Sequence, residues 1–147
     1  MQDAYLIGTS CTRFGKQPGA SFKALTREAY LAVLADAGLA DGGRIGNAWF
    51  GNCGMGSWGQ RNIRGQVCFT PLVQEGLFPE RVAMINVEGG CATASMALHG
   101  AWKDVLSGTA ELSLAIGVEK TFVPDSVPNA AARQQEIFDG GDRKSVV

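Results

Sequence analysis

The apolar positions of the chain predict four strands and a long first helix. Four short apolar runs, bounded by polar or glycine-containing segments, are typical of buried strands: residues 4–9, 45–51, 81–87 and 112–118. Between the first two runs, apolar residues recur at helical spacing from Phe22 to Ala37. Ser21 is a suitable N-cap for this helix, and Gly38 is a suitable stop. The 81–87 run is almost wholly apolar, which predicts a strand covered on both faces.

A second helix is expected directly after the 81–87 strand. A line of residues at helical spacing begins there: Cys91, Ser95, Leu98 and Trp102. This helix should end near Gly108. Residues 67–75 are weakly helical, with Pro71 placed in the first turn. The order of strands and helices predicts an α/β fold, with a mixed, mostly parallel sheet and helices on both faces.

The chain divides into one domain and a polar carboxyl-terminal part. Residues 1–122 carry all the predicted strands and helices. Over residues 123–141, proline, asparagine and glutamine replace the apolar runs, which indicates the start of an excursion away from the sheet. Residues 142–147 read DRKSVV, which one reading frame of a common sequencing adapter also encodes. We therefore expect this tail to be non-native and the gene to be truncated.

Composition and charge narrow the classes of function. The chain has 147 residues, of which 46% are hydrophobic, and this is enough for one buried core. With 13 basic and 14 acidic residues and no basic cluster, nucleic acid is not an expected partner. No apolar run reaches the roughly 20 residues of a membrane span. The amino terminus lacks the pattern of a secretory signal. We expect a cytoplasmic protein that does not enter a membrane.

The cysteines indicate a nucleophile more than a metal site. The four cysteines are Cys11, Cys53, Cys68 and Cys91. They form no C-x-x-C pair, and His99 is the single histidine, so neither a zinc site nor a disulfide framework is expected. Glycine is about twice as frequent as the usual ~7%, with 20 residues. Residues 52–60 are too rich in glycine for regular structure, which predicts a loop near the functional site.

Cys91 is the strongest candidate for chemistry. It opens a predicted helix, where unpaired backbone N–H groups and the helix dipole favour a thiolate. Gly89 and Gly90 before it let a substrate approach closely, and the backbone N–H of Cys91 could face an oxyanion. The alternative is a small buried residue at a close contact between helix and strand, because most free cysteines are buried.

Four ordered segments resemble the thiolase family, especially the branch of sterol-carrier-protein-type thiolases and acetyl-CoA acetyltransferases. The segment 87–95, which contains Cys91, resembles the nucleophile region of that family. The other three matching segments are Tyr5 to Gly8 with Thr12 to Lys16, Gly59-Gln60 with Asn62 and Arg64, and Gly117-Val118-Glu119-Lys120. Together they cover residues 4–122. The resemblance implies the first of two α/β halves of a thiolase fold.

The resemblance also implies acyl transfer to and from coenzyme A, with Cys91 as the nucleophile. Coenzyme A would be a co-substrate in lipid metabolism, and no permanently bound cofactor or metal is expected. The family supplies its histidine base, its second catalytic cysteine and further oxyanion donors from the second half, so this chain alone should be inactive.

His99 lies eight helical positions from Cys91, about 12 Å, too far for a base. We interpret Cys11, Cys53 and Cys68 as structural. The family further implies a homodimer, and some members work with a small acyl-CoA-binding protein.

Two features leave the interpretation open. Glu88 lies three positions before Cys91, where a carboxylate facing the sulfur would oppose a thiolate. Glu88 could instead cap the helix or pair across an interface. The second feature is Ala94, which stands where the family usually has glycine. The loop 52–66, with Trp58, Arg61 and Arg64, could line an acyl pocket, contact coenzyme A phosphates or pack against a second subunit.

Two other functions remain as alternatives. A thiolase-fold carbon–carbon lyase, aldolase or condensing enzyme would use the same scaffold without thiolysis, and a Glu88 carboxylate facing Cys91 would favour it. A half-length binding or regulatory subunit would need another chain to cover its exposed apolar face. The acyl chain length, the direction of the reaction and the pathway do not follow from these residues.

Overall fold

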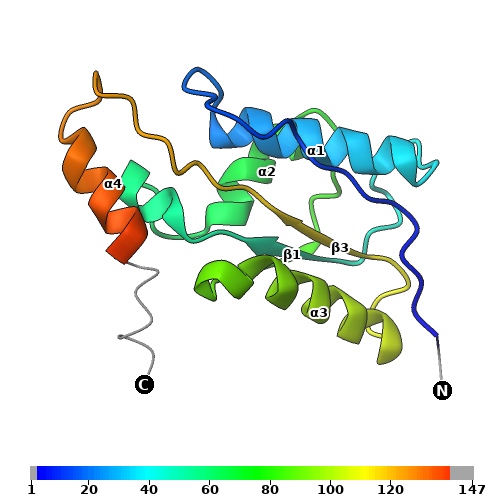
Figure 1. The fold of residues 1–147 in the computed structure, drawn as a ribbon. Helices are drawn as coiled ribbons and strands as arrows, with labels where there is room; N and C mark the ends of the chain where they lie inside the picture. The colour runs from blue at the N-terminus through cyan, green and yellow to red at the C-terminus, as the bar shows by residue number, and fades with distance from the viewer. Residues whose placement is uncertain (1–2, 140–147) are drawn as a thin grey trace.

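A three-stranded parallel sheet with helices on both faces forms the centre of the molecule (Figure 1). The computed structural model describes residues 3–139. The strands are β1 (Asn47–Gly51), β2 (Ala83–Val87) and β3 (Ser113–Gly117), in the order β2-β1-β3. The helices are α1 (Phe22–Asp36), α2 (Arg64–Gln74), α3 (Thr93–Leu106) and α4 (Ala130–Asp139), with two short 3₁₀ turns, η1 (Gly54–Trp58) and η2 (Gly90–Ala92). Helix α3 covers one face, and α1 and α2 cover the other. The predicted fold class is confirmed.

The first helix forms as its pattern predicts. The Ser21 hydroxyl accepts a hydrogen bond from the Ala24 amide at 3.0 Å and so caps the free N–H groups of α1. The buried face of α1 includes Tyr30 and Leu34. Tyr30 packs edge to face against Phe69 and Phe78, with ring centroids 5.4 and 5.7 Å apart. These aromatic contacts join α1 to α2 and to the segment that leads into β2.

Helix α2 begins earlier than predicted, and Pro71 lies inside it and not in its first turn. Proline has no backbone N–H, which costs one hydrogen bond of the helix. The helix tolerates this loss because Cys68, Phe69 and Leu72 on its inner face are buried in the core. Its start is capped from another element, since the Asn86 side chain of β2 accepts the Gly65 N–H at 2.6 Å.

Strand β2 is less buried than predicted. Ala83 is exposed, and the other four residues of β2 are half-buried. The cause is topology: β2 pairs with β1 alone, so it is an edge of the described sheet, and its apolar sequence does not make it a central strand. The predicted strands at 45–51 and 112–118 are confirmed as β1 and β3.

The predicted strand at residues 4–9 is wrong. Its side chains are largely exposed, 80% for Tyr5 and 73% for Leu6. The segment runs beside α1, where the Thr9 N–H donates to Asp36 at 2.8 Å and the Ser10 hydroxyl donates to the Ala29 carbonyl at 2.7 Å. A strand forms only where a neighbour accepts its backbone hydrogen bonds, and no strand in the described part of the chain pairs with these residues.

The last described helix, α4, follows an irregular segment that leaves the sheet after β3. Arg133 of α4 donates to the Ser57 carbonyl at 2.8 Å, which ties α4 to η1. The domain boundary at residue 122 stays a prediction, and the expected non-native tail, residues 142–147, lies outside the described residues. None of the described helices is long and apolar enough to cross a membrane.

Candidate active site

All three parallel strands end at one edge of the sheet, and the candidate residues follow those ends. Asn52 and Cys53 come after β1, Glu88 and Cys91 come after β2, and Glu119 comes after β3. Ligands of parallel α/β sheets usually bind at the carboxyl ends of the strands. A large open groove of about 2110 Å³ reaches this edge, and Cys53, Cys91 and Glu119 are among its lining residues.

Cys91 lies where its neighbours in the sequence predict, between a strand and a helix. It is the middle residue of η2, directly before α3, and it is an exposed free cysteine. The buried alternative is therefore wrong for this residue. Gly90 has a φ of 55°, a left-handed conformation that favours glycine, which explains the glycine before Cys91.

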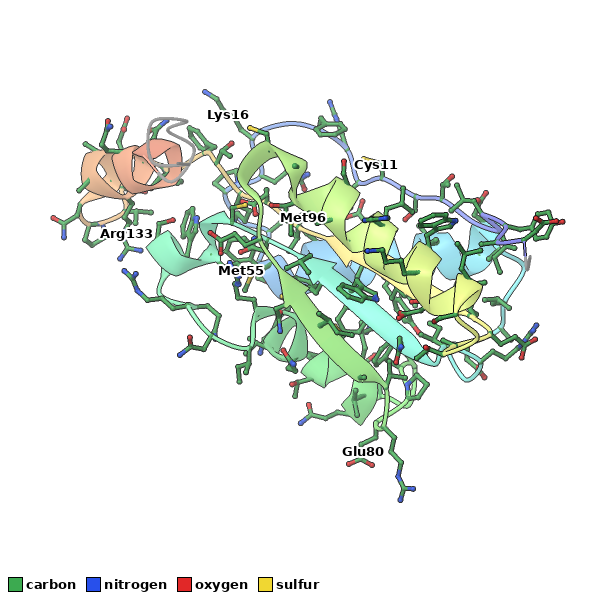
Figure 2. The ribbon with its side chains drawn as sticks, turned by 90° about the horizontal axis from the view of Figure 1, so that it is seen from below. Cys11, Lys16, Met55, Glu80, Met96 and Arg133 are labelled. Atoms are coloured by element: carbon green, nitrogen blue, oxygen red, sulfur yellow. The ribbon has the colours of Figure 1, made fainter. Side chains whose placement is uncertain are left out.

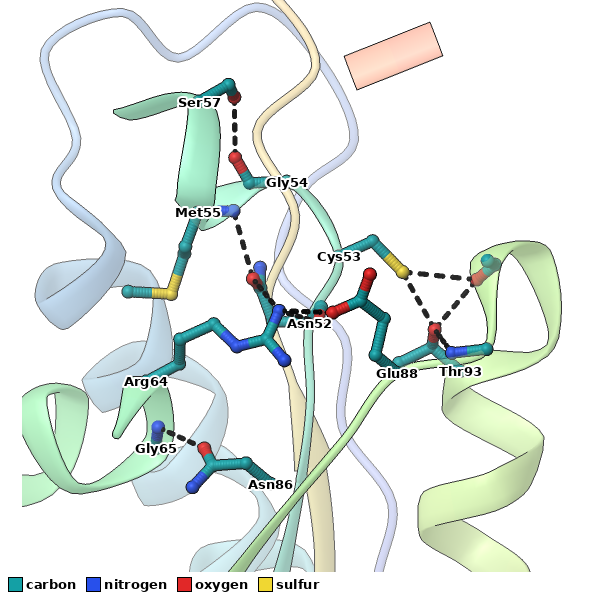
Figure 3. Close-up of polar contacts among 12 residues, drawn as sticks. Asn52, Cys53, Gly54, Met55, Ser57, Arg64, Gly65, Asn86, Glu88 and Thr93 are labelled. Carbon is teal, nitrogen blue, oxygen red and sulfur yellow. Dashed lines mark hydrogen bonds and ion pairs between the residues drawn. The ribbon is translucent and has the colours of Figure 1, made fainter. Parts of the chain in front are cut away.

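Thr93 and Cys53 hold the turn that carries Cys91 (Figure 3). The Thr93 hydroxyl accepts the Gly89 N–H at 2.9 Å and donates to the Gly90 carbonyl at 2.7 Å. The Cys53 thiol lies 2.9 Å from the Thr93 hydroxyl and donates to the Gly90 carbonyl at 3.4 Å. Cys53, interpreted from the sequence as structural, thus contacts the residue next to Cys91.

Arg64 joins the ends of β1 and β2 on the other side of this turn (Figure 3). Its Nη1 donates to the Asn52 carbonyl at 2.6 Å and to the Glu88 carboxylate at 2.9 Å. The Arg64 side chain is only 13% exposed, whereas that of Glu88 is 56% exposed. Asn52 is fully buried, and its amide donates to the Val118 carbonyl at 2.6 Å. Glu88 therefore pairs within the chain, with α2.

Glu119 holds the backbone after β1. Its carboxylate accepts the N–H groups of Cys53 and Gly54, the latter at 3.0 Å to Oε2. Burial raises the pKa of Glu119 above its ordinary value, and the bonds from the two N–H groups and the charge of Arg64 oppose that rise. The Glu88 charge acts in the same direction as burial. Arg64, Glu88 and Glu119 are therefore close enough to interact electrostatically.

The raised pKa of Glu119 leads to a prediction for the variant Glu119→Gln. A carboxyl group with a higher pKa in the folded state binds its proton more tightly when folded, so stability falls as pH rises above the ordinary value of 4.5. Glutamine does not titrate, so the wild type should lose stability relative to Glu119→Gln between about pH 4 and about pH 7. Urea unfolding at both pH values measures this. An unchanged difference would contradict the raised pKa.

The remaining cysteines and the histidine lie in different surroundings. His99 stacks on Trp102, with ring centroids 5.4 Å apart, on the exposed part of α3. Cys68 is buried in the core, and burial raises the pKa of its thiol. Cys11 is exposed on the amino-terminal segment (Figure 2). Figure 2 also labels Met96 on α3, an exposed side chain close to Gly89.

The glycine-rich loop after β1 packs largely within the chain. Trp58 contacts Phe22, with ring centroids 6.2 Å apart, and its Nε1–H donates to the Lys120 carbonyl at 3.2 Å. The Lys120 ammonium lies 5.1 Å from the Trp58 ring centre, and burial lowers its pKa. Arg61 lines the groove. Trp58 thus stabilises the loop against α1 and the segment after β3.

Sequence patterns missed the contacts of Thr93, Asn52 and Cys53. The contacts of Cys53 with Thr93 and of Asn52 with Val118 join residues far apart in the chain. Two signals were present: Arg64 and Glu119 belong to segments that resemble a known family. That resemblance singled out Arg64 and Glu119 but implied no contact or function for either side chain.

Comparison with known proteins identifies the family. A family model described as "Thiolase, N-terminal domain" matches residues 4–144. An acetyl-CoA acetyltransferase of Methanothermobacter thermautotrophicus is 34% identical over 139 residues, which are 92% of this chain and 34% of the relative. An acetyl-CoA acetyltransferase of Methanocaldococcus jannaschii is 35% identical over 145 residues, 95% of this chain and 35% of the relative.

A third relative has a name that refers to an assembly. The benzoylsuccinyl-CoA thiolase subunit BbsB of Thauera aromatica is 32% identical over 115 residues, 78% of this chain and 27% of the relative. The chain spans about a third of the length of the two acetyl-CoA acetyltransferases. The matched region includes every described strand and helix as well as Cys91. The family that the motifs predicted is thus confirmed: the chain belongs to the thiolase family, whose N-terminal domain it matches over residues 4–144.

Proposed function

We propose that this chain is the amino-terminal part of a thiolase-type acyltransferase in which Cys91 carries the acyl group. The observation that carries the proposal is the position of Cys91, an exposed thiol in the turn before α3 at the carboxyl edge of the sheet. Membership of the thiolase family and the acetyl-CoA acetyltransferase relatives support the same activity. Coenzyme A is then a co-substrate and not a permanently bound cofactor.

The reaction is two acyl transfers through one sulfur. The Cys91 thiolate attacks the 3-keto carbon of a 3-ketoacyl-CoA, and the bond between C2 and C3 breaks. The released fragment gains a proton and leaves as acetyl-CoA, while the acyl group stays on Sγ as a thioester. The sulfur of a second coenzyme A then attacks this thioester, and the Cys91 thiolate leaves. The backbone N–H of Cys91 would stabilise the oxyanion that forms in each transfer.

Turnover requires groups from outside this chain. The described residues place Cys53 and Thr93 beside the turn of Cys91, where they hydrogen-bond to the Gly90 carbonyl and contact each other. His99 stacks on Trp102 and is too far along α3 to act as the base. The chain alone should therefore accept an acyl group slowly and should not turn over.

The first test is the site of acylation in the chain itself. Incubation with acetyl-CoA or acetoacetyl-CoA, followed by mass spectrometry of peptides, should locate a single acyl group on Cys91. Cys11 is the internal control because it is also an exposed free cysteine. Equal acylation of Cys11 and Cys91 would show nonspecific thiol chemistry and would contradict the proposal.

The second test joins the chain to the rest of a relative. A chimera joins residues 1–139 to the remaining part of the Methanothermobacter acetyl-CoA acetyltransferase. It should cleave acetoacetyl-CoA with coenzyme A, and the same chimera with Cys91→Ala should not. Circular dichroism checks that both chimeras fold. A folded chimera that is acylated at Cys91 but never releases product would favour a different second step.

The two alternative functions differ in their support. A Glu88 carboxylate facing Cys91 would favour a lyase or aldolase, and this carboxylate binds Arg64 instead. A binding subunit finds its support in the relative BbsB, which is named a thiolase subunit. Co-purification with a second chain that restores acyltransferase activity would favour the hypothesis of a binding subunit. The proposal also includes a cytoplasmic location, a homodimer and a small acyl-CoA-binding partner.

A further inference from the structure

The pair of Arg64 and Glu88 is the feature of this edge that the proposed reaction does not use. Glu88 is three residues before Cys91, so an unpaired carboxylate there would disfavour a thiolate at Cys91. The carboxylate is instead 2.9 Å from Arg64 Nη1. In Figure 3 its side chain extends toward Arg64, while Thr93 at the start of α3 lies on the opposite side.

The arginine is held rigidly enough to fix this carboxylate. Its Nη1 also donates to the carbonyl of Asn52, which is fully buried. Asn52 in turn accepts the Met55 N–H at 3.0 Å and donates to the Val118 carbonyl at 2.6 Å. Arg64 is thus bound to the end of β1 and, through Asn52, is linked to the end of β3. An arginine that is 13% exposed needs a nearby negative charge, and Glu88 supplies it.

The backbone directly before Arg64 is strained, and the contacts of Arg64 and Gly65 offset this strain. Ile63 has a φ of 45°, the left-handed region, which a β-branched residue rarely adopts. Its side chain is 60% exposed, so burial of the side chain does not offset the strain. The helix starts at the next residue, Arg64, without a local side-chain cap. The contacts of Arg64 and the bond from Gly65 N–H to Asn86 offset the strain.

We propose that Arg64 is a positioning residue that holds the Glu88 carboxylate away from Cys91 and neutralises its charge, so that the Cys91 thiolate can form. This inference rests on the proposed role of Cys91. Arg64 touches no reacting atom in this role. It acts through Glu88 and the turn that follows it.

The proposal predicts opposite effects from two single variants. Arg64→Ala leaves the Glu88 charge unpaired, so the midpoint of the pH–rate curve for alkylation of Cys91 should rise by about half a pH unit. Glu88→Gln leaves the Arg64 charge unpaired, so the midpoint should fall by a similar amount. The double variant should return close to the wild type. A purely structural role would not produce opposite signs.

Iodoacetamide labelling of each cysteine across pH, followed by peptide mass spectrometry, measures these midpoints in the whole chain. The other charged or titratable groups that line the groove at this edge include Cys53, Arg61, Glu119 and Lys120, and they are unchanged in all variants. Arg27→Ala is the matched control, because it breaks an exposed ion pair with Glu75 between α1 and α2. It should leave the Cys91 midpoint unchanged.

Each outcome decides the proposal. Shifts of the two single variants in the same direction, or no shift in folded variants, would overturn it. If Arg64→Ala does not fold, Glu88→Gln decides alone: a lower midpoint supports the proposal, and an unchanged or higher one overturns it. Alkylation needs no acyl-CoA, so this result is separate from the proposed function. Wild-type protein that never takes an acyl group on Cys91 would overturn the function and leave the role of Arg64 standing.

Discussion

Replacing Cys91 by alanine is expected to lower the rate of acyl transfer from acyl-CoA by about 10³-fold or more. In the proposed reaction the thioester forms on Sγ, and no other described group occupies the same position before α3. Cys91→Ala should also change stability little, because the side chain is exposed. The measurement is acyl incorporation into the chain and turnover by the chimera, each compared with the unsubstituted protein.

One control variant and the position of any remaining acyl group make this result specific. Cys11→Ala removes another exposed thiol and should leave acylation unchanged. Cys53 is distant in sequence but contacts the turn of Cys91, since its thiol donates to the Gly90 carbonyl. If Cys91→Ala is still acylated, and the acyl group is found on Cys53, then the nucleophile has been assigned to the wrong residue.

Replacing Gly100 by valine is expected to destabilise the chain by about 3 kcal/mol or more. Gly100 lies on the inner face of α3, where an added Cβ would overlap the ring of Trp49 on β1. The ring cannot easily move aside, because its Nε1–H donates to Asp104 at 2.6 Å. Asp104 also accepts the Ser113 hydroxyl at 2.8 Å, which ties α3 to β3.

Urea unfolding measures this loss, and the alkylation of Cys91 reports its consequence for the site. A displaced α3 would carry the Cys91 turn with it, so the preference of iodoacetamide for Cys91 over Cys11 should fall. Gly19→Ala is the control, because a Cβ at Gly19 meets nothing within 4 Å. That variant should change stability by less than about 0.5 kcal/mol. A stable Gly100→Val protein would show that α3 can move off the sheet at low cost.

Local sequence patterns were sufficient to predict α1, β1 and β3. The N-cap Ser21 and the helical spacing after it predicted α1, and short apolar runs predicted β1 and β3. Helix α2 was anticipated only weakly, because Pro71 contradicts a helix locally. Packing of Phe69 and Leu72 in the core outweighs that local preference.

The prediction of residues 4–9 as a strand failed for a related reason. An apolar run shows that a segment could pair, but pairing needs a neighbour in space. Among the described residues, this segment is hydrogen-bonded to α1 through Thr9 and Ser10 and is not paired with β3. The same limit explains β2, whose apolar sequence did not reveal that it would be an edge of the described sheet.

The sequence by itself determined the fold class, the family and the place of Cys91 between a strand and a helix. Those features depend on residues close together in the chain, where periodicity, glycines and capping residues act. Only the tertiary structure decided that Glu88 binds Arg64, 24 positions away, and that Cys53 lies beside Thr93, 40 positions away. Parallel strands bring their carboxyl ends to one edge, and this geometry joins side chains that no local pattern can pair.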